Sequence, residues 1–320
     1  MKKSTRHLLN SSEQKYRFIE MFRNEFPVER MAKVLDITRD SYYKWLRRRQ
    51  SKRKQENEFL LSRIRHIFYL HKKRYGSSRI HAELKKENIT CSRRRVAKLM
   101  KSANLISIRY KRHRYPENKN SEKIDKYPPN LLNQDFTVDS PNKVWVSDIT
   151  YIPTKEGWLY LTTIIDLFNR EVVGESRSYN LKTENTVIKA LYEAMRKRKP
   201  KEKLIFHSDK GVQYHSKEFR NILKAFNITQ STSGKGNCYD NAVAESFFKT
   251  LKSELLSNGA FKTKREAKIK VFEYIELYYN KKRIHSSLNW CTPEEYLENY
   301  YRNTDKREEE TQQVEQKEAV

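Results

Sequence analysis

Three stretches of this chain decide its fold: VWVSDITYI (residues 144–152), LIFHSDKGVQY (204–214) and YDNAVAESFFKTLKSELL (239–256). Each carries one carboxylate, namely Asp148, Asp209 and Glu245. The β-branched and aromatic residues around Asp148 predict a strand, and the apolar run before Asp209 predicts a buried strand with that residue at its carboxyl end. Open α/β sheets bind their ligands at that edge.

The third stretch predicts a helix that Asp240 or Asn241 could cap. One apolar stripe is expected inside: Val243, Phe247, Leu251 and Leu255. Glu245, Lys249 and Lys252 follow at i, i+4 and i+7, so we expect them on one other face. Taken singly, a buried Asp is more often a cap or an ion-pair partner than a metal ligand, but three acids with this spacing favour a shared site.

Carboxylates gathered from separate elements repel one another unless a cation lies between them. Oxygen ligands without His or Cys suit Mg²⁺ or Mn²⁺. A pair of such ions holds the attacking and leaving oxygens of an in-line phosphoryl displacement. The acids therefore predict a two-ion site for phosphodiester chemistry, with Asp166 a supporting residue and Asp240 a helix cap.

Thirty-five residues separate Asp209 from Glu245, and Lys252 follows seven later. This spacing resembles the pattern of the transposase and retroviral integrase superfamily. Longer motifs around these residues make the resemblance more specific. They are WVSDITYIPT, LTTIIDLFNREVVG, FHSDKGVQYHS, the run D-N-A-x-A-E-S-F-F and YYNKKRIHSSLNWCTPEEY. Together these motifs resemble the OrfB transposase of the IS-three family of bacterial insertion sequences, over most of the chain.

The resemblance implies a ribonuclease-H-like α/β fold with a mixed five-stranded sheet, preceded by all-α DNA-binding modules of helix-turn-helix type. It implies that Asp148, Asp209 and Glu245 bind metal and that Lys252 holds DNA. Lys249, expected on the same helix face, is a further candidate for DNA contact. It also implies a circular DNA intermediate and a partner or fused reading frame, OrfA. Arg283 and His285 lie in its C-terminal signature and could touch DNA or brace the core.

The formal net charge of +27 points to a polyanionic partner. Residues 1–115 hold 33 Lys or Arg and 10 Asp or Glu, so most of this charge precedes the core. No apolar run has membrane-spanning length and no signal peptide is evident, which favours a cytoplasmic protein. The resemblance implies a bacterial protein associated with the nucleoid. The three cysteines are far apart, so neither a disulfide framework nor a zinc site is expected.

Two basic helical modules are expected before the core. Residues 1–50, with two short helices and a turn near Asp36, resemble a helix-turn-helix, although a plain helical hairpin is the alternative. Residues 51–115 form the second module, which begins with a charged connector (51–60). Its buried stripe would leave arginines free for phosphates. The DNA-contacting candidates of both modules are Tyr42, Lys44, Arg47, Arg93, Arg94, Arg95 and Lys98.

A proline-containing linker (116–142) leads to the catalytic core (143–256). Three successive strands and then strands alternating with helices predict the mixed sheet. A helical extension (257–300) and a disordered, charged tail (301–320) complete the chain. The loop from Gly234 to Asn237 is expected to be mobile until DNA arrives.

The leading hypothesis is a DNA transposase that uses divalent metal to cut one strand at the ends of an insertion sequence. The free 3′-hydroxyl then attacks target DNA, with terminal inverted repeats bound by a homo-oligomer. One rival is a ribonuclease-H-like nuclease that never joins ends. The other is a DNA-binding regulator that uses only the N-terminal modules.

Overall fold

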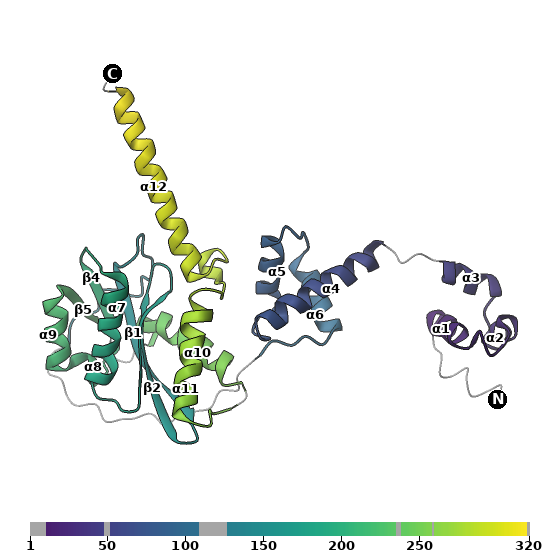
Figure 1. The fold of residues 1–320 in the computed structure, drawn as a ribbon, viewed down its shortest axis with the longest axis horizontal. Helices are drawn as coiled ribbons and strands as arrows, with labels where there is room; N and C mark the ends of the chain where they lie inside the picture. The colour runs from purple at the N-terminus through teal and green to yellow at the C-terminus, as the bar shows by residue number, and fades with distance from the viewer. Residues whose placement is uncertain (1–10, 48–51, 109–126, 235–237, 258, 319–320) are drawn as a thin grey trace.

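The computed structural model describes residues 11–47, 52–108, 127–234, 238–257 and 259–318, with side chains at 238–239 and beyond 306 left aside. A five-stranded sheet has the order β3-β2-β1-β4-β5. Its strands are β1 (Val144–Thr154), β2 (Gly157–Asp166), β3 (Val172–Ser178), β4 (Leu204–Ser208) and β5 (Ile228–Thr232). The first three pair antiparallel, whereas β4 and β5 run parallel to β1. The predicted mixed sheet is therefore confirmed (Figure 1).

Helices cover both faces of this sheet. One face packs on the helical turn η1 (Glu184–Ile188) with α7 (Lys189–Arg198) and on α9 (Lys217–Ala225), beside the short α8 (Val212–His215). Gly174 is required there because a Cβ would lie 2.3 Å from the Ala190 carbonyl oxygen. The other face packs on α10 (Ala242–Leu255), α11 (Lys264–Phe272) and η3 (Glu273–Tyr279). Burying both faces explains the strands' apolar sequences.

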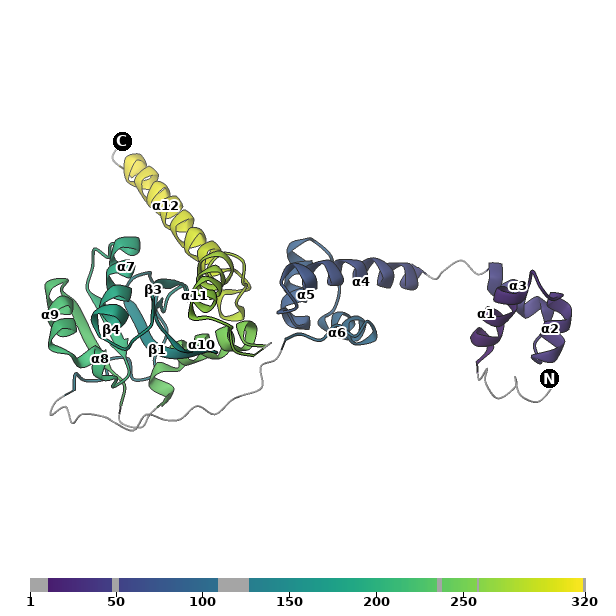
Figure 2. The same cartoon turned by 60° about the horizontal axis from the view of Figure 1, so that its bottom comes forward.

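Two helical clusters precede the core (Figures 1 and 2). Each has an apolar centre, and Ile284 of the C-terminal segment is part of that of the second. The first contains α1 (Ser12–Phe22), α2 (Val28–Val34) and α3 (Arg39–Arg47). Asp36 has a φ of 55° in the α2–α3 turn, a conformation that Asp tolerates in the absence of glycine. The second contains α4 (Lys52–Leu70), α5 (Ser77–Lys86) and α6 (Arg93–Ser102), with Ser92 capping α6 as expected.

Two expectations about irregular segments were wrong. The connector at 52–60 is the start of α4, because its Lys, Arg, Glu and Gln residues favour helix and no breaker interrupts them. The tail is helical in α12 (Pro293–Glu318), since its Glu-, Gln- and Lys-rich sequence has the same preference. The predicted mobile loop at 235–237 and much of the predicted linker lie outside the described residues. Among those that are described, no helix is long and apolar enough to cross a membrane.

Candidate active site

The parallel pairing of β1 and β4 brings two of the three acids together. Ser147 on β1 pairs with Ser208 on β4, and Asp148 and Asp209 occupy the next position on each chain. Matching positions on neighbouring parallel strands project to the same face of a sheet. The two carboxylates therefore meet at the carboxyl end of β4, as the sequence predicted.

Each of these acids is oriented by one backbone N–H group. Asp148 Oδ1 accepts from its neighbour Ile149 N at 2.7 Å, and Asp209 Oδ1 accepts from Gly211 N at 2.9 Å. A Cβ on Gly211 would lie 3.0 Å from that Asp209 oxygen. Glycine at this position therefore lets the backbone support the carboxylate without crowding it.

The site carries an excess of negative charge, on the half-buried Asp148 and Asp209 and the exposed Glu245. Burial raises the pKa of Asp148 well above its ordinary value, and the charges of Asp209 and Glu245 raise it further, while Lys252 opposes them. Burial likewise raises the pKa of Asp209, against the Gly211 hydrogen bond. A divalent cation would relieve this repulsion, and carboxylate oxygens are the donors that Mg²⁺ prefers. The residues present at Asp148 and Asp209 thus fit such an ion.

Glu245 lies one turn into α10 and is exposed. Its charge reaches Asp148, but no group of three His, Cys, Asp or Glu side chains within the described ranges has the geometry to hold a metal ion. The structure therefore brings Asp148 and Asp209 together and leaves Glu245 nearby, outside ligand geometry.

The two lysines of α10 have different surroundings. Lys252 is partly buried; burial lowers its pKa and the charge of Asp148 raises it, which places the ammonium close to the acids. Lys249 is exposed and lines a cavity on the side of α10 that faces the second module.

Two residues of the site were not nominated from the sequence. The buried Tyr214 hydroxyl lies 2.8 Å from Ser147 Oγ, and burial with the charges of Asp148 and Asp209 raises the Tyr214 pKa well above its ordinary value. Asn241 Nδ2 donates to the Ser147 carbonyl at 3.2 Å and so fastens the start of α10 beside Asp148. The available sequence signal was their position in two motifs next to the acids, Gly-Val-Gln-Tyr for Tyr214 and Asp-Asn-Ala for Asn241.

Asp166 and Asp240 do not make the contacts that the sequence predicted, which were support of the site for Asp166 and a helix cap for Asp240. Asp166 accepts from the backbone N–H groups of Asn142 and Phe168, so it braces the chain at the end of β2 and does not support Asp148. Asp240 accepts from Gly234 N and Asn130 Nδ2 and does not cap α10, whose N-cap residue makes no side-chain cap bond.

One DNA-contact candidate in the first module was wrong. Tyr42 is 1% exposed and donates to Glu20 at 2.6 Å, so its ring belongs to the module's core. Helical periodicity explains the error, because α3 turns Tyr42 inward and leaves Lys44 and Arg47 exposed.

The second module keeps most of its candidate cations at the surface. Arg93, Arg94 and Lys98 are exposed on α6. Arg95 is half-buried and donates to Glu56 at 2.9 Å and to Asn57 at 2.8 Å, which ties α6 to α4.

Arg283 and His285 brace the protein from within. Arg283 is 4% exposed and its Nε donates to Glu254 Oε1 at 3.0 Å, linking the C-terminal segment to the last turn of α10. Arg283 Nη1 lies 3.3 Å from His285 Nε2. Burial and the nearby arginines lower the pKa of His285 to about 2, so this imidazole is neutral at physiological pH.

The chain matches known families over most of its length. An integrase core domain family matches residues 138–238, a second integrase core domain family matches 227–293, and an HTH-like domain family matches 54–113.

Similar proteins include the transposase for insertion sequence element IS904 of Lactococcus lactis, 43% identical over 78% of this chain and 98% of that protein. The transposase InsF for insertion sequence IS3A of Escherichia coli is 37% identical over 88% of this chain and 98% of its own length. Among solved structures, the catalytic core domain of BIV integrase is 21% identical over 51% of this chain and 99% of that domain, with a TM-score of 0.39.

Proposed function

Because this chain belongs to the IS-three family of insertion-sequence transposases, we propose that it cuts DNA at the ends of an insertion sequence and joins the free 3′-hydroxyl to target DNA. The observation that carries this proposal is the pair of half-buried, mutually repelling carboxylates at the end of parallel strands β1 and β4. Cleavage and joining use the same in-line displacement at phosphorus, so one site serves both.

Asp148 and Asp209 would hold Mg²⁺ or Mn²⁺, with Glu245 as the third ligand. Such ions, when bound, lower the pKa of an attacking water and offset charge on the leaving oxygen. The protein's own part is positional: Ile149 N and Gly211 N orient the two aspartates, and Tyr214 supports Ser147 beneath them. Lys252 supplies a positive charge beside the acids for the phosphodiester.

Glu245 would reach the site by a side-chain rotation. The residue is exposed, and its charge already acts on Asp148. Exposed glutamates change rotamer at little cost, whereas Asn241 keeps the helix itself against β1. A metal ion bound by the two aspartates would provide the attraction.

The partners follow from the same chemistry. We propose that the protein works in the bacterial cytoplasm as a homo-oligomer on terminal inverted repeats and target DNA, together with an OrfA product. The HTH-like domain match and the exposed cations of α6 support the DNA contact.

The test compares Asp209→Asn with Asp139→Asn, a control that neutralises an exposed acid before β1. The donor duplex is an end of the element with a labelled 3′-hydroxyl, incubated with Mg²⁺ and a second duplex. Asp209→Asn should abolish joining while end binding persists, and Asp139→Asn should retain both joining and end binding. Joining by Asp209→Asn at the wild-type rate would overturn the assignment.

The same assay separates the rival functions. A nuclease would release cut strands from the wild-type chain without attaching the label to the second duplex. A regulator would bind the ends equally with and without Mg²⁺ and cut nothing.

A further inference from the structure

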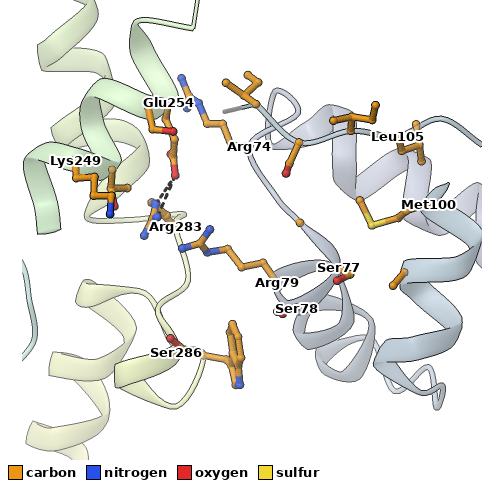
Figure 3. Close-up of a pocket in the computed structure, with 18 of the residues that line it drawn as sticks. Arg74, Ser77, Ser78, Arg79, Met100, Leu105, Lys249, Glu254, Arg283 and Ser286 are labelled. Carbon is orange, nitrogen blue, oxygen red and sulfur yellow. Dashed lines mark hydrogen bonds and ion pairs between the residues drawn. The ribbon is translucent and has the colours of Figure 1, made fainter. Parts of the chain in front are cut away.

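A large cavity separates the second module from the core (Figure 3). Its volume is about 920 Å³. Arg74, Arg79, Met100 and Leu105 line one side, and Lys249, Glu254, Arg283 and Ser286 line the other. The cavity therefore belongs to neither part alone.

The two walls are fastened together by a buried tyrosine. Tyr75 is fully buried, its hydroxyl donates to the Lys282 carbonyl at 3.0 Å, and the same oxygen accepts from Ile284 N at 3.0 Å. Beside it, Arg79 Nε donates to the Ile284 carbonyl at 3.2 Å. Buried backbone and side-chain groups paired in this way fix the width of the cavity.

The lining is strongly positive. Five cationic side chains reach the cavity: Arg74, Arg79, Lys101, Lys249 and Arg283. Glu254 is the one acid among the lining residues, and its carboxylate is already paired with Arg283. Serine hydroxyls, including those of Ser77, Ser246 and Ser286, also line it. Cations and small hydroxyl donors around an open cavity suit an anion with several oxygens.

A smaller adjoining cavity of about 330 Å³ extends this surface toward the start of α10. It shares Arg79, Arg283 and Ser246 with the larger one and adds Arg170. Arg170 Nη1 is buried and has no hydrogen-bond partner among the residues that the structure describes. An unpaired buried guanidinium nitrogen is costly unless a ligand accepts from it, which again points to an anion.

We propose that these joined cavities hold backbone phosphates of the DNA strand that leads to the acids. This rests on the proposed function and names the path of its substrate. Ser246 follows Glu245 directly on α10 and Lys249 lies one turn on, so a phosphate bound here sits against the helix that carries the third acid. The exposed Arg93, Arg94 and Lys98 of α6 would take the phosphates that follow.

The experiment measures DNA binding without catalysis. Lys101→Gln and Lys249→Gln are made singly and together in the Asp209→Asn chain. The matched control is Lys189→Gln, an exposed lysine on α7 at the opposite sheet face. Fluorescence anisotropy follows a duplex of arbitrary sequence in EDTA at several salt concentrations. Thermal melting checks that each variant folds.

Each phosphate contact contributes about −0.9 to the slope of log K against log salt. Each cavity variant should therefore flatten the slope by about 0.9 and weaken binding about five- to ten-fold near 0.1 M salt, and the double variant should lose both contacts. The control should match the parent.

A double variant with the parent's slope would overturn the proposal. A second result would also overturn it: calorimetry shows that inorganic phosphate binds the parent and not the double variant, while the salt slope of DNA binding is the same in both. The cavity would then be a site for small anions only. Neither result depends on strand joining, so the function proposed above is tested separately.

Discussion

Replacing Arg283 with methionine tests how firmly the C-terminal segment supports α10. Arg283 is 4% exposed and Glu254 9%, and both Nε and Nη2 of the arginine lie 3.0 Å from Glu254 Oε1. The opposite carboxylate oxygen accepts from Tyr274 at 3.0 Å. Arg283→Met therefore leaves a carboxylate buried with one neutral donor.

Removing one partner of a buried ion pair costs about 3–5 kcal/mol. At about 2–4 °C per kcal/mol for a domain of this size, the core transition should fall by roughly 6–20 °C. Calorimetry of the full chain resolves this transition, and urea unfolding followed by near-ultraviolet circular dichroism gives the free energy directly.

The double variant Glu254→Gln/Arg283→Met is the matched control. It removes the buried charge together with its partner, so most of the lost stability should return. A cost below about 1 kcal/mol for Arg283→Met, as for an exposed ion pair, would refute the bracing role. So would a double variant as unstable as the single one.

Three further predictions follow from the site and its supports. Folding raises the pKa of Asp148 above 3.8, so the stability of the metal-free chain should fall as pH rises past that value. Asp148→Asn should therefore stabilise the metal-free chain and abolish the shift in its melting temperature with Mg²⁺. Melting temperatures unchanged by the substitution would contradict this. Asn241→Ala should reduce strand joining at least ten-fold with DNA binding intact, because α10 loses its bond to Ser147; joining at the parental rate would refute it. Burial lowers the pKa of His71 from 6.5 to about 4, so the contribution of its neutral imidazole to stability is lost as pH falls from 6.5 toward 4. Hydrogen exchange around Tyr75, corrected for the chemical rate, should therefore accelerate at pH 5. A constant protection factor would argue against this.

The sequence determined the elements of the core and two of its acids. Strands and helices with apolar stripes can be predicted from short stretches of sequence, because side-chain periodicity follows from backbone geometry. Asp148 interrupts one such strand and Asp209 follows another, and the parallel pairing of β1 with β4 in the structure brings the two together.

The tertiary structure decided which polar residues are free to act. Tyr42 and Arg95 looked available for DNA, but their partners Glu20 and Glu56 lie 22 and 39 positions away and could not be assigned from spacing. Arg283 and Glu254 form their buried pair from different elements in the same way. The cavity between the second module and the core also depends on long-range contacts, such as those of Tyr75 with residues more than two hundred positions along the chain. Local sequence specifies backbone conformation and which face is apolar, whereas the partner of a buried charge depends on long-range packing.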